Sequence, residues 1–271
     1  MRPGRSDIAI PDLAPDLTWV GERPQPMPQL SAAGPVLVHF LDFAQLNSVR
    51  AMPYVLEWRR RYCDAGLAVL GVQAPRFEFG ADERKVAAGL ERLGVEHPVA
   101  IDADREIWLD YGCQGWPSLF LWGKGGALRW YHFGEGEYAA TEEAIQAELR
   151  EADALRELPS TMEPLRATDA PGAAVMPPTP ETFPAGEGQA LTAGAEPLEI
   201  FYEAGGAYAA LDGSGRIRVA VDGGPDAETT VEEAGLYELA SHPRHEAHRL
   251  GIEIAAGEVD IWSVSFAPGV P

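Results

Sequence analysis

The sequence predicts an α/β domain at residues 31–156 followed by a small all-β sandwich at residues 198–271. Two observations support the first domain. Short, continuously apolar segments flank a helical pattern, and a glycine-rich loop joins two further apolar segments. A third observation supports the second domain: six short apolar segments alternate with turn signals, without a helical pattern.

Proline marks the limits of these domains. Of the 23 prolines in the 271 residues, seven fall between Pro3 and Pro35 and eight between Pro159 and Pro197. Because proline-rich stretches are typical of connecting segments, residues 1–30 are predicted as an N-terminal extension. Residues 157–197 are predicted as a linker on the same grounds.

The α/β domain begins with a buried β-α-β unit. Residues 36–41 are apolar and rich in β-branched side chains, which is typical of a strand covered on both faces. A helical pattern covers residues 46–65 and ends at Gly66, and a second apolar strand follows at 67–73. A strand, a helix and a strand in this order predict a parallel pair with a right-handed crossover.

The remaining elements of the domain follow from periodicity and from glycine. Apolar residues at helical spacing predict further helices, and Gly123-Lys-Gly-Gly126 is a hairpin signal. The predicted elements are a helix at 82–93, a strand at 95–101, a helix at 104–111, a hairpin at 118–122 and 128–133, and a helix at 141–155.

The β domain is predicted from short strands and turns. Asp212-Gly213 and Asp222-Gly223 are turn dipeptides between apolar segments. Its aromatic residues alternate with aliphatic ones, which favours a core over a carbohydrate-binding surface. The predicted strands are 198–202, 207–211, 217–221, 236–240, 250–255 and 259–266.

Charge and apolar content exclude several classes of function. The formal net charge is −21, and both domains are acidic, so nucleic acid and anionic membranes are not expected as partners. No apolar segment has the length of a membrane span or of a signal peptide core, so we expect a cytoplasmic location. The glycine motifs of nucleotide-binding loops are missing, and no cofactor is expected.

Several segments in fixed order resemble one known family. They are the strand 36–41, Gly71-Val-Gln-Ala-Pro-Arg-Phe-Glu-Phe79, Pro98-Val-Ala-Ile-Asp102, Trp116-Pro117 and His132-Phe-Gly-Glu-Gly-Glu-Tyr138. Together they resemble thioredoxin-like redoxin domains, the thiol-disulfide oxidoreductases of the TlpA and DipZ type. The resemblance covers residues 18–149 and implies a thioredoxin-like fold, with a central mixed sheet flanked by helices. The C-terminal region is similar to the β domain that sometimes follows such redoxins.

The resemblance places a Cys-x-x-Cys motif where this chain has Gln45-Leu46-Asn47-Ser48. In the family, the helix N-terminus stabilises a thiolate there, and that sulfur attacks the disulfide. An amide cannot form a mixed disulfide and an unassisted hydroxyl does not replace the second thiol. No catalytic residue is therefore expected at the motif, and a module that binds a peptide, a protein or a small ligand is predicted.

The resemblance also places Pro117 at the family's cis-proline, next to the motif. There, a free backbone edge accepts extended peptides, and such a site can outlast the loss of the cysteines. We expect the binding groove to be lined by Phe43, Gln45, Asn47, Ser48, Trp116 and Pro117.

The two cysteines leave an enzymatic alternative open. Cys113 lies three residues before Trp116, so a single-thiol oxidoreductase or peroxidase using Cys113 is the competing hypothesis. Cys113 equally suits a small apolar role, because free cysteine is often buried. Cys63 is expected on the inner face of the helix 46–65, in the core.

Three histidines, His242, His245 and His248, are weak candidates for a metal site. Pro243 and the neighbouring strands favour a loop, and no cysteine lies nearby. No metal site is therefore expected, and these histidines are predicted to lie in a solvated turn.

Overall fold

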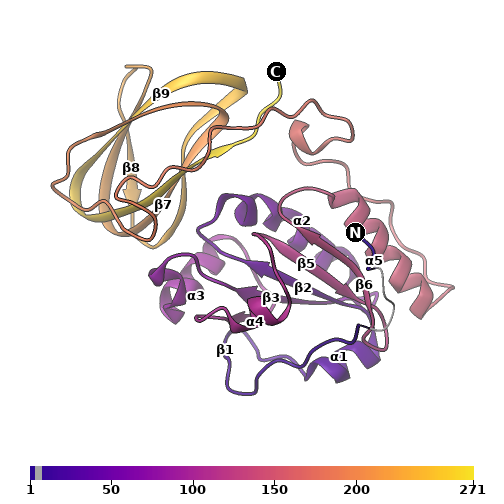
Figure 1. Cartoon of the computed structure of the whole chain (residues 1–271). Helices are drawn as coiled ribbons and strands as arrows, with labels where there is room; N and C mark the ends of the chain where they lie inside the picture. Colours follow the sequence, from indigo (N-terminus) through magenta and orange to yellow (C-terminus); the bar gives the residue numbers. More distant parts are fainter. Residues whose placement is uncertain (4–7) are drawn as a thin grey trace. The chain divides into compact units, whose positions relative to one another are not determined.

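The computed structural model describes residues 1–3 and 8–271 and divides into two compact units. The first consists of Met1–Phe43 and Asn47–Glu163, and the second of Pro164–Pro271 with Ala44–Leu46. We call them the α/β unit and the β unit and treat each separately (Figure 1). The first holds a six-stranded mixed sheet with helices, and the second a three-stranded antiparallel sheet.

The sheet of the α/β unit has the strand order β1-β4-β3-β2-β5-β6. Its centre is the predicted parallel pair, β2 (Val36–Leu41) and β3 (Ala68–Gln73), joined by α2 (Leu46–Tyr62). The predicted hairpin is also confirmed, because β5 (Ser118–Trp122) pairs antiparallel with both β2 and β6 (Leu128–Phe133). The predicted thioredoxin-like arrangement of a mixed sheet between helices is therefore present.

Two apolar layers hold helices against the sheet. On one face, Leu37 and Leu121 pack with Trp58 of α2 and Ile145 of α5 (Tyr138–Ala152). On the other face lie α1 (Met27–Ala33) and α4 (Glu106–Asp110), and their side chains belong to the same apolar cluster as Phe40. The remaining helical segments are η1 (Glu78–Ala81) and α3 (Glu83–Arg92), and β4 is Val99–Ile101.

The N-terminal extension contributes elements that the sequence did not predict. It contains β1 (Thr18–Val20), which pairs antiparallel with β4, and α1. Residues near the start of the chain also pair with the outer edge of β6. The Ile10 N–H donates to the Gly126 carbonyl at 2.7 Å, and the Leu128 N–H to the Ile8 carbonyl at 2.9 Å.

Cys63 does not lie in the core as predicted. The thiol is exposed and lies 3.8 Å from a carboxylate oxygen of Asp64. The reason is helical phase. Helix α2 buries Trp58 and Tyr62 and ends at Tyr62, so the next residue is turned about 100° away from the buried face.

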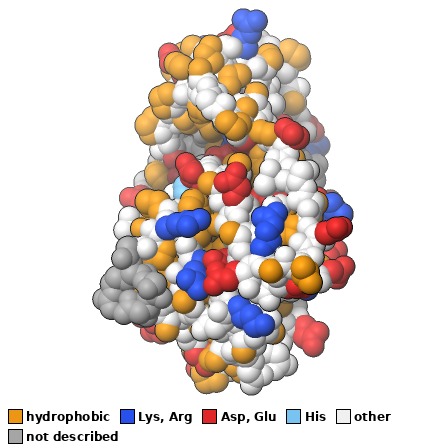
Figure 2. Space-filling model, turned by 90° about the vertical axis from the view of Figure 1, so that its right-hand side faces the viewer, with side chains coloured by type: hydrophobic (Ala, Val, Ile, Leu, Met, Phe, Trp, Pro, Cys, Tyr) orange, Lys and Arg blue, Asp and Glu red, His pale blue; other side chains and the backbone are white. Residues whose placement is uncertain are grey.

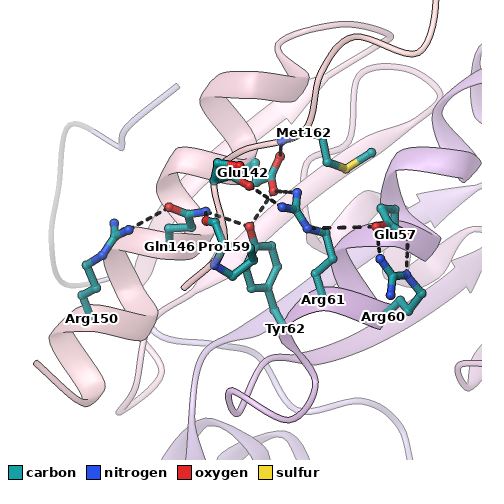
Figure 3. Close-up of polar contacts among 10 residues, drawn as sticks. Glu57, Arg60, Arg61, Tyr62, Glu142, Gln146, Arg150, Pro159 and Met162 are labelled. Carbon is teal, nitrogen blue, oxygen red and sulfur yellow. Dashed lines mark hydrogen bonds and ion pairs between the residues drawn. The ribbon is translucent and has the colours of Figure 1, made fainter. Parts of the chain in front are cut away.

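A buried carboxylate ties the end of the α/β unit to its helices (Figure 3). The Glu142 side chain is 1% exposed and accepts hydrogen bonds from the Tyr62 hydroxyl and from Arg61, both at 2.5 Å. Its second oxygen accepts the Met162 N–H at 2.8 Å, and Gln146 donates to the Pro159 carbonyl at 2.8 Å. This Glu142 network fixes residues 159–162 on α2 and α5.

The β unit is built from two long, bent strands rather than six short ones. They are β7 (Leu198–Val221) and β9 (Gly235–Ala267), with β8 (Ala227–Val231) beside β7. Leu211 pairs with both Gly235 and Ile261, so different parts of β9 occupy both edges of β7. The sheet therefore bends around an apolar core that includes Ile217, Ile252 and Val264.

The predicted turn at Asp212-Gly213 lies inside β7 instead. Gly213 has a φ of +100°, and a Cβ there would lie 2.1 Å from the Glu258 carbonyl oxygen. Glycine is needed because the two strands approach each other closely, not because the chain reverses. The dipeptide Asp222-Gly223 does form a turn, with Asp222 at a φ of +55°.

The predicted linker, residues 157–197, makes specific backbone contacts. Thr182 and Val264 exchange two hydrogen bonds of 2.8 Å, and Leu191 and Ile261 exchange two of 2.9 Å. A short helical turn, η2, covers Ala167–Asp169. The second half of this segment therefore follows the edge of β9.

Candidate functional site

The segment Gln45-Leu46-Asn47-Ser48 lies where β2 gives way to α2, which begins at Leu46. Ser48 is 1% exposed, and its hydroxyl oxygen accepts the Asp42 N–H at 3.1 Å. That hydroxyl supports the β2–α2 loop from inside and does not face a ligand, which corrects the expected role of Ser48. Gln45 and Asn47 are half-buried.

Phe43 is also withdrawn from the predicted groove. Its side chain is fully buried, and its ring lies 5.9 Å from the Phe79 ring, centroid to centroid. A Cβ at Gly89 of α3 would come within 2.4 Å of the Phe43 ring, so the helix packs directly on it. Gln73 accepts the Phe43 N–H at 3.1 Å, which fixes the backbone at this point. Phe43 is a core residue.

The peptide bond between Trp116 and Pro117 is cis, as the resemblance implies. The half-buried Trp116 indole stacks on Trp108 at 4.3 Å between ring centroids, and its N–H donates to the Ala74 carbonyl at 2.8 Å. The Pro117 carbonyl accepts the Gly134 N–H at 2.7 Å. The Trp116 ring is therefore fixed against α4 and the end of β3.

Two ion pairs that sequence patterns did not indicate join the segments around this region. Asp42, 1% exposed, accepts the Arg76 N–H at 3.0 Å, and the Arg76 guanidinium lies 3.6 Å from the same carboxylate oxygen. Arg50 of α2 donates to Glu135 at 2.7 Å. The two residues of the Asp42–Arg76 pair lie 34 positions apart in the chain, and those of the Arg50–Glu135 pair lie 85 apart. No local spacing could therefore have predicted either pair.

Cys113 occupies an environment that keeps its sulfur protonated. Burial raises the pKa of the Cys113 thiol to about 12, and the hydrogen bond with Ser118 only partly opposes this. The Cys113 side chain packs against the apolar layer that contains Phe40 and Trp108. At neutral pH it is a thiol, whereas nucleophilic attack requires a thiolate.

The three candidate metal ligands do not come together. His242 and His248 stack, with 3.7 Å between ring centroids, while the His245 N–H donates to the Val270 carbonyl at 2.8 Å. A hydrogen bond already occupies the Nε2 of His242, and another the Nδ1 of His248. Over residues 1–3 and 8–271, no three His, Cys, Asp or Glu side chains have an arrangement that could hold a metal ion. These histidines lie in β9, not in a solvated turn.

An open cavity of about 600 Å³ lies between residues 11–18 and 101–111 and has an acidic wall that includes Asp16 and Asp104. Distant segments form that wall, so no motif marks it in the sequence. In the β unit, the aromatic side chains do not form a carbohydrate platform, because Phe201 is 74% exposed while Tyr202, Trp262 and Phe266 are buried.

The surface carries mixed charge. On the face that Figure 2 shows, Lys and Arg side chains lie among Asp and Glu side chains. Over the described part of the chain, no helix is both long enough and apolar enough to cross a bilayer.

Comparisons with known proteins agree with this geometry, although no family model matches the chain. Protein DipZ of Mycobacterium bovis is 34% identical over 176 residues, which cover 64% of this chain and 25% of DipZ. The thiol-disulfide oxidoreductase YkuV of Bacillus subtilis is 27% identical over 145 residues, covering 53% of this chain and 96% of YkuV. The chain thus spans about a quarter of the length of DipZ.

Two solved structures overlap with about half of the chain. A thioredoxin-like protein in the oxidised form has a TM-score of 0.46 and 24% identity, covering 55% of this chain and 97% of its own. A thiol:disulfide interchange protein DsbE from Chlorobium tepidum has a TM-score of 0.45 and 20% identity, covering 54% and 98%. The α/β unit, with its parallel β2–β3 pair and cis-proline, has a thioredoxin-like fold and is similar in sequence to DipZ and YkuV, and a C-terminal β domain follows it.

Proposed function

We propose that this protein is a binding module that has kept the redoxin scaffold and does not carry out dithiol exchange. The chemistry at the start of α2 supports this most directly. Residues 42–50 contain no cysteine, and the Ser48 hydroxyl is engaged with the backbone of Asp42. Without a sulfur at either position, a mixed disulfide with a substrate has no first bond to form.

The proposed ligand is an extended peptide at the Trp116-Pro117 edge. Phe43, Ser48 and Pro117 are buried, and Gln45 groups with the β unit. The groove of the α/β unit therefore reduces to Asn47, Trp116 and the backbone edge at Pro117. The fixed Trp116 indole supports this proposal, because a rigid, half-buried aromatic ring offers contact area at little entropic cost. Extended peptides bind such edges through backbone hydrogen bonds, and side-chain pockets supply specificity.

The test is selection from a library of random ten-residue peptides on the full chain. The selected peptides are then measured against Trp116→Ala and against Leu109→Ala, a control at an exposed α4 residue. The proposal predicts at least tenfold weaker binding to Trp116→Ala and unchanged binding to Leu109→Ala. Peptides that bind Trp116→Ala as tightly as the unmodified protein would rule out the groove.

The competing hypothesis is a single-thiol oxidoreductase or peroxidase that uses Cys113. Its support is the position of Cys113, in the turn that leads to the cis-proline. The raised pKa of the buried thiol argues against it, because the thiolate fraction at pH 7 is negligible.

Thiol titration separates the two hypotheses. The binding module predicts that one thiol, Cys63, reacts with a disulfide reagent at pH 7, and that Cys113 reacts only after unfolding. Insulin and peroxide reduction should be at background level. Activity that disappears in Cys113→Ser but survives in Cys63→Ser would establish the enzyme instead.

We also propose a cytoplasmic location for this module. Two unpaired cysteines, one of them exposed, suit a reducing compartment. Fractionation of cells, with thiol labelling of the intact protein, tests this; recovery of the protein with oxidised cysteines in a secreted fraction would refute it.

A further inference from the structure

Four side chains of the β unit form a polar cluster that the proposed function does not use. They are Tyr202 of β7, Asp222 in the turn after β7, and His242 and His248 of β9. The two imidazole rings are almost parallel, with 3.7 Å between centroids and 14° between planes. The Nδ1 of His248 lies 2.8 Å from the Asp222 carboxylate, and the Nε2 of His242 lies 2.8 Å from the Tyr202 hydroxyl. We call this arrangement the imidazole pair.

The geometry allows one added proton. A proton on His248 faces the Asp222 carboxylate, which is also held by the Arg249 N–H at 2.8 Å. A second proton, on His242, would place two cations in stacked rings 3.7 Å apart. It would also turn the His242 Nε2 into a hydrogen-bond donor, so the Tyr202 hydroxyl would have to accept the hydrogen bond between them. That hydroxyl keeps its own proton, because burial raises the pKa of Tyr202 to about 12.

Among the described residues, no second carboxylate is hydrogen-bonded to the pair. The Tyr202 ring lies 5.9 Å from the His242 ring and 5.7 Å from the His248 ring, centroid to centroid, and the His248 Nε2 is buried without a hydrogen-bond partner in that part of the chain. Glu246 and Asp222 are the acidic groups that favour a charged His242, but burial and His248 outweigh them and lower the pKa of His242. Asp222 is the carboxylate in hydrogen-bond contact with the pair, so it can compensate one positive charge there and not two.

The imidazole pair lies where the pairing of β9 with β7 is irregular. The register between β7 and β9 breaks where Ala204 pairs with Glu246 and Gly206 with Ser241, so residues 242–245 lie outside the regular ladder. Within this stretch, the His245 N–H donates to the Val270 carbonyl. Separation of the two rings would free residues 242–245 and, with them, the contact to the end of the chain.

We infer that the imidazole pair is a proton-operated latch: the stacked rings hold residues 242–245 closed, and positive charge on both rings opens them. The device is independent of the peptide groove. A mildly acidic environment would therefore open residues 242–245 of the β unit locally.

The number of protons taken up on opening tests the latch. Amide hydrogen exchange of residues 242–245 is measured in the full chain between pH 6.5 and 5 and corrected for intrinsic exchange. The open segment takes up protons that the closed stack excludes, so the opening constant should rise as the pH falls below 6.5, approaching tenfold per pH unit for each proton taken up. An opening constant that does not change with pH overturns the inference.

Three variants test which side chains cause the pH dependence of opening. Asp222→Asn removes the compensating charge, so the opening constant should rise more steeply as the pH falls than in the unmodified protein. His242→Gln keeps a hydrogen-bonding group but cannot be protonated, so the pH dependence should vanish. His245→Gln is the matched control and should behave like the unmodified protein. A wild-type pH dependence in His242→Gln contradicts the latch.

A measurement on the unmodified protein covers the case in which a variant fails to fold. The ring proton signals of His242 and the amide signals of residues 242–245 are followed together by NMR. The latch requires both to change over the same pH interval. A His242 ring that titrates while the amides stay unchanged contradicts it.

Discussion

The contact between Gly89 and Phe43 shows how one missing side chain shapes the candidate site. Helix α3 lies directly on the Phe43 ring because residue 89 has no Cβ, and Phe43 is thereby held in the core, immediately after the first residue of the β2–α2 loop. The position of the loop that begins α2 therefore depends on a glycine more than forty residues away. Sequence patterns treat Gly89 only as a weak helix residue, so the contact was not predicted.

Gly89→Ala should destabilise the protein by about 1–2 kcal/mol. Alanine gains up to about 1 kcal/mol of helix propensity, but its methyl group would lie 2.4 Å from a buried ring, and such overpacking costs about 1–3 kcal/mol. Urea unfolding followed by tryptophan fluorescence measures the change. Gly115→Ala, where a Cβ meets no atom within 4 Å, is the control and should shift stability by less than about 0.5 kcal/mol. Equal stability of the two variants would contradict the packing argument.

At the scale of elements, the Glu142 network decides where the α/β unit ends. Residues 159–162 have no regular secondary structure, and they are held by side chains of α2 and α5 (Figure 3). Because Glu142 is buried with Arg61 and the Tyr62 hydroxyl beside it, its loss leaves polar groups without their partner.

Glu142→Ala should cost roughly 3 kcal/mol, as expected when one partner of a buried ion pair is removed. The Met162 amide should lose protection from hydrogen exchange at the same time. Glu143→Ala, at the neighbouring exposed position, is the matched control and should change neither quantity. An unchanged Met162 amide in Glu142→Ala would mean that other contacts hold this segment.

Local patterns predicted the elements whose signals are local. Continuous apolar runs gave β2 and β3, glycines marked the ends of their helices, and Gly123–Gly126 gave the β5–β6 hairpin. Elements that depend on distant partners were missed. Strand β1 exists because it pairs with β4, about eighty residues away, and the long strands of the β unit arise from pairing along both edges of β7.

The candidate site divides in the same way. The cis peptide at Pro117 followed from the resemblance and was confirmed, whereas the burial of Phe43 and Ser48 was not foreseen. Both residues are placed by tertiary contacts, with α3 and with the Asp42 backbone, and these contacts leave no trace in the local spacing.

At the scale of the whole molecule, two buried histidines set the response of the α/β unit to acid. His39 of β2 and His97 before β4 are at most 2% exposed, and none of their ring nitrogens has a hydrogen-bond partner among the described residues. Burial lowers the pKa of His39 to about 3 and that of His97 to about 4. The unfolded chain, with histidines near 6.5, therefore binds more protons than the folded chain below that pH.

Stability should consequently fall with pH from about 6.5 towards 4, by about 1.4 kcal/mol per pH unit for each of the two histidines. Urea unfolding at several pH values measures this slope, and six of the seven tryptophans lie in the α/β unit and report on it. His39→Leu removes one of the two histidines, so the slope should fall by about 1.4 kcal/mol per pH unit. Carboxylates contribute equally to the slopes of the unmodified protein and of His39→Leu. Identical slopes in the two proteins would therefore refute the role of His39.

The pairing of residues 8–10 with β6 bears on how fragments of this protein should be cut. A fragment that starts at residue 11 or later leaves the backbone groups of Gly126 and Leu128 unpaired at the rim of the six-stranded sheet. An open strand edge is a template for association with another chain. Such a shortened form should self-associate at concentrations at which the full chain does not. Any oligomer observed with the shortened form would then result from the removal of these residues.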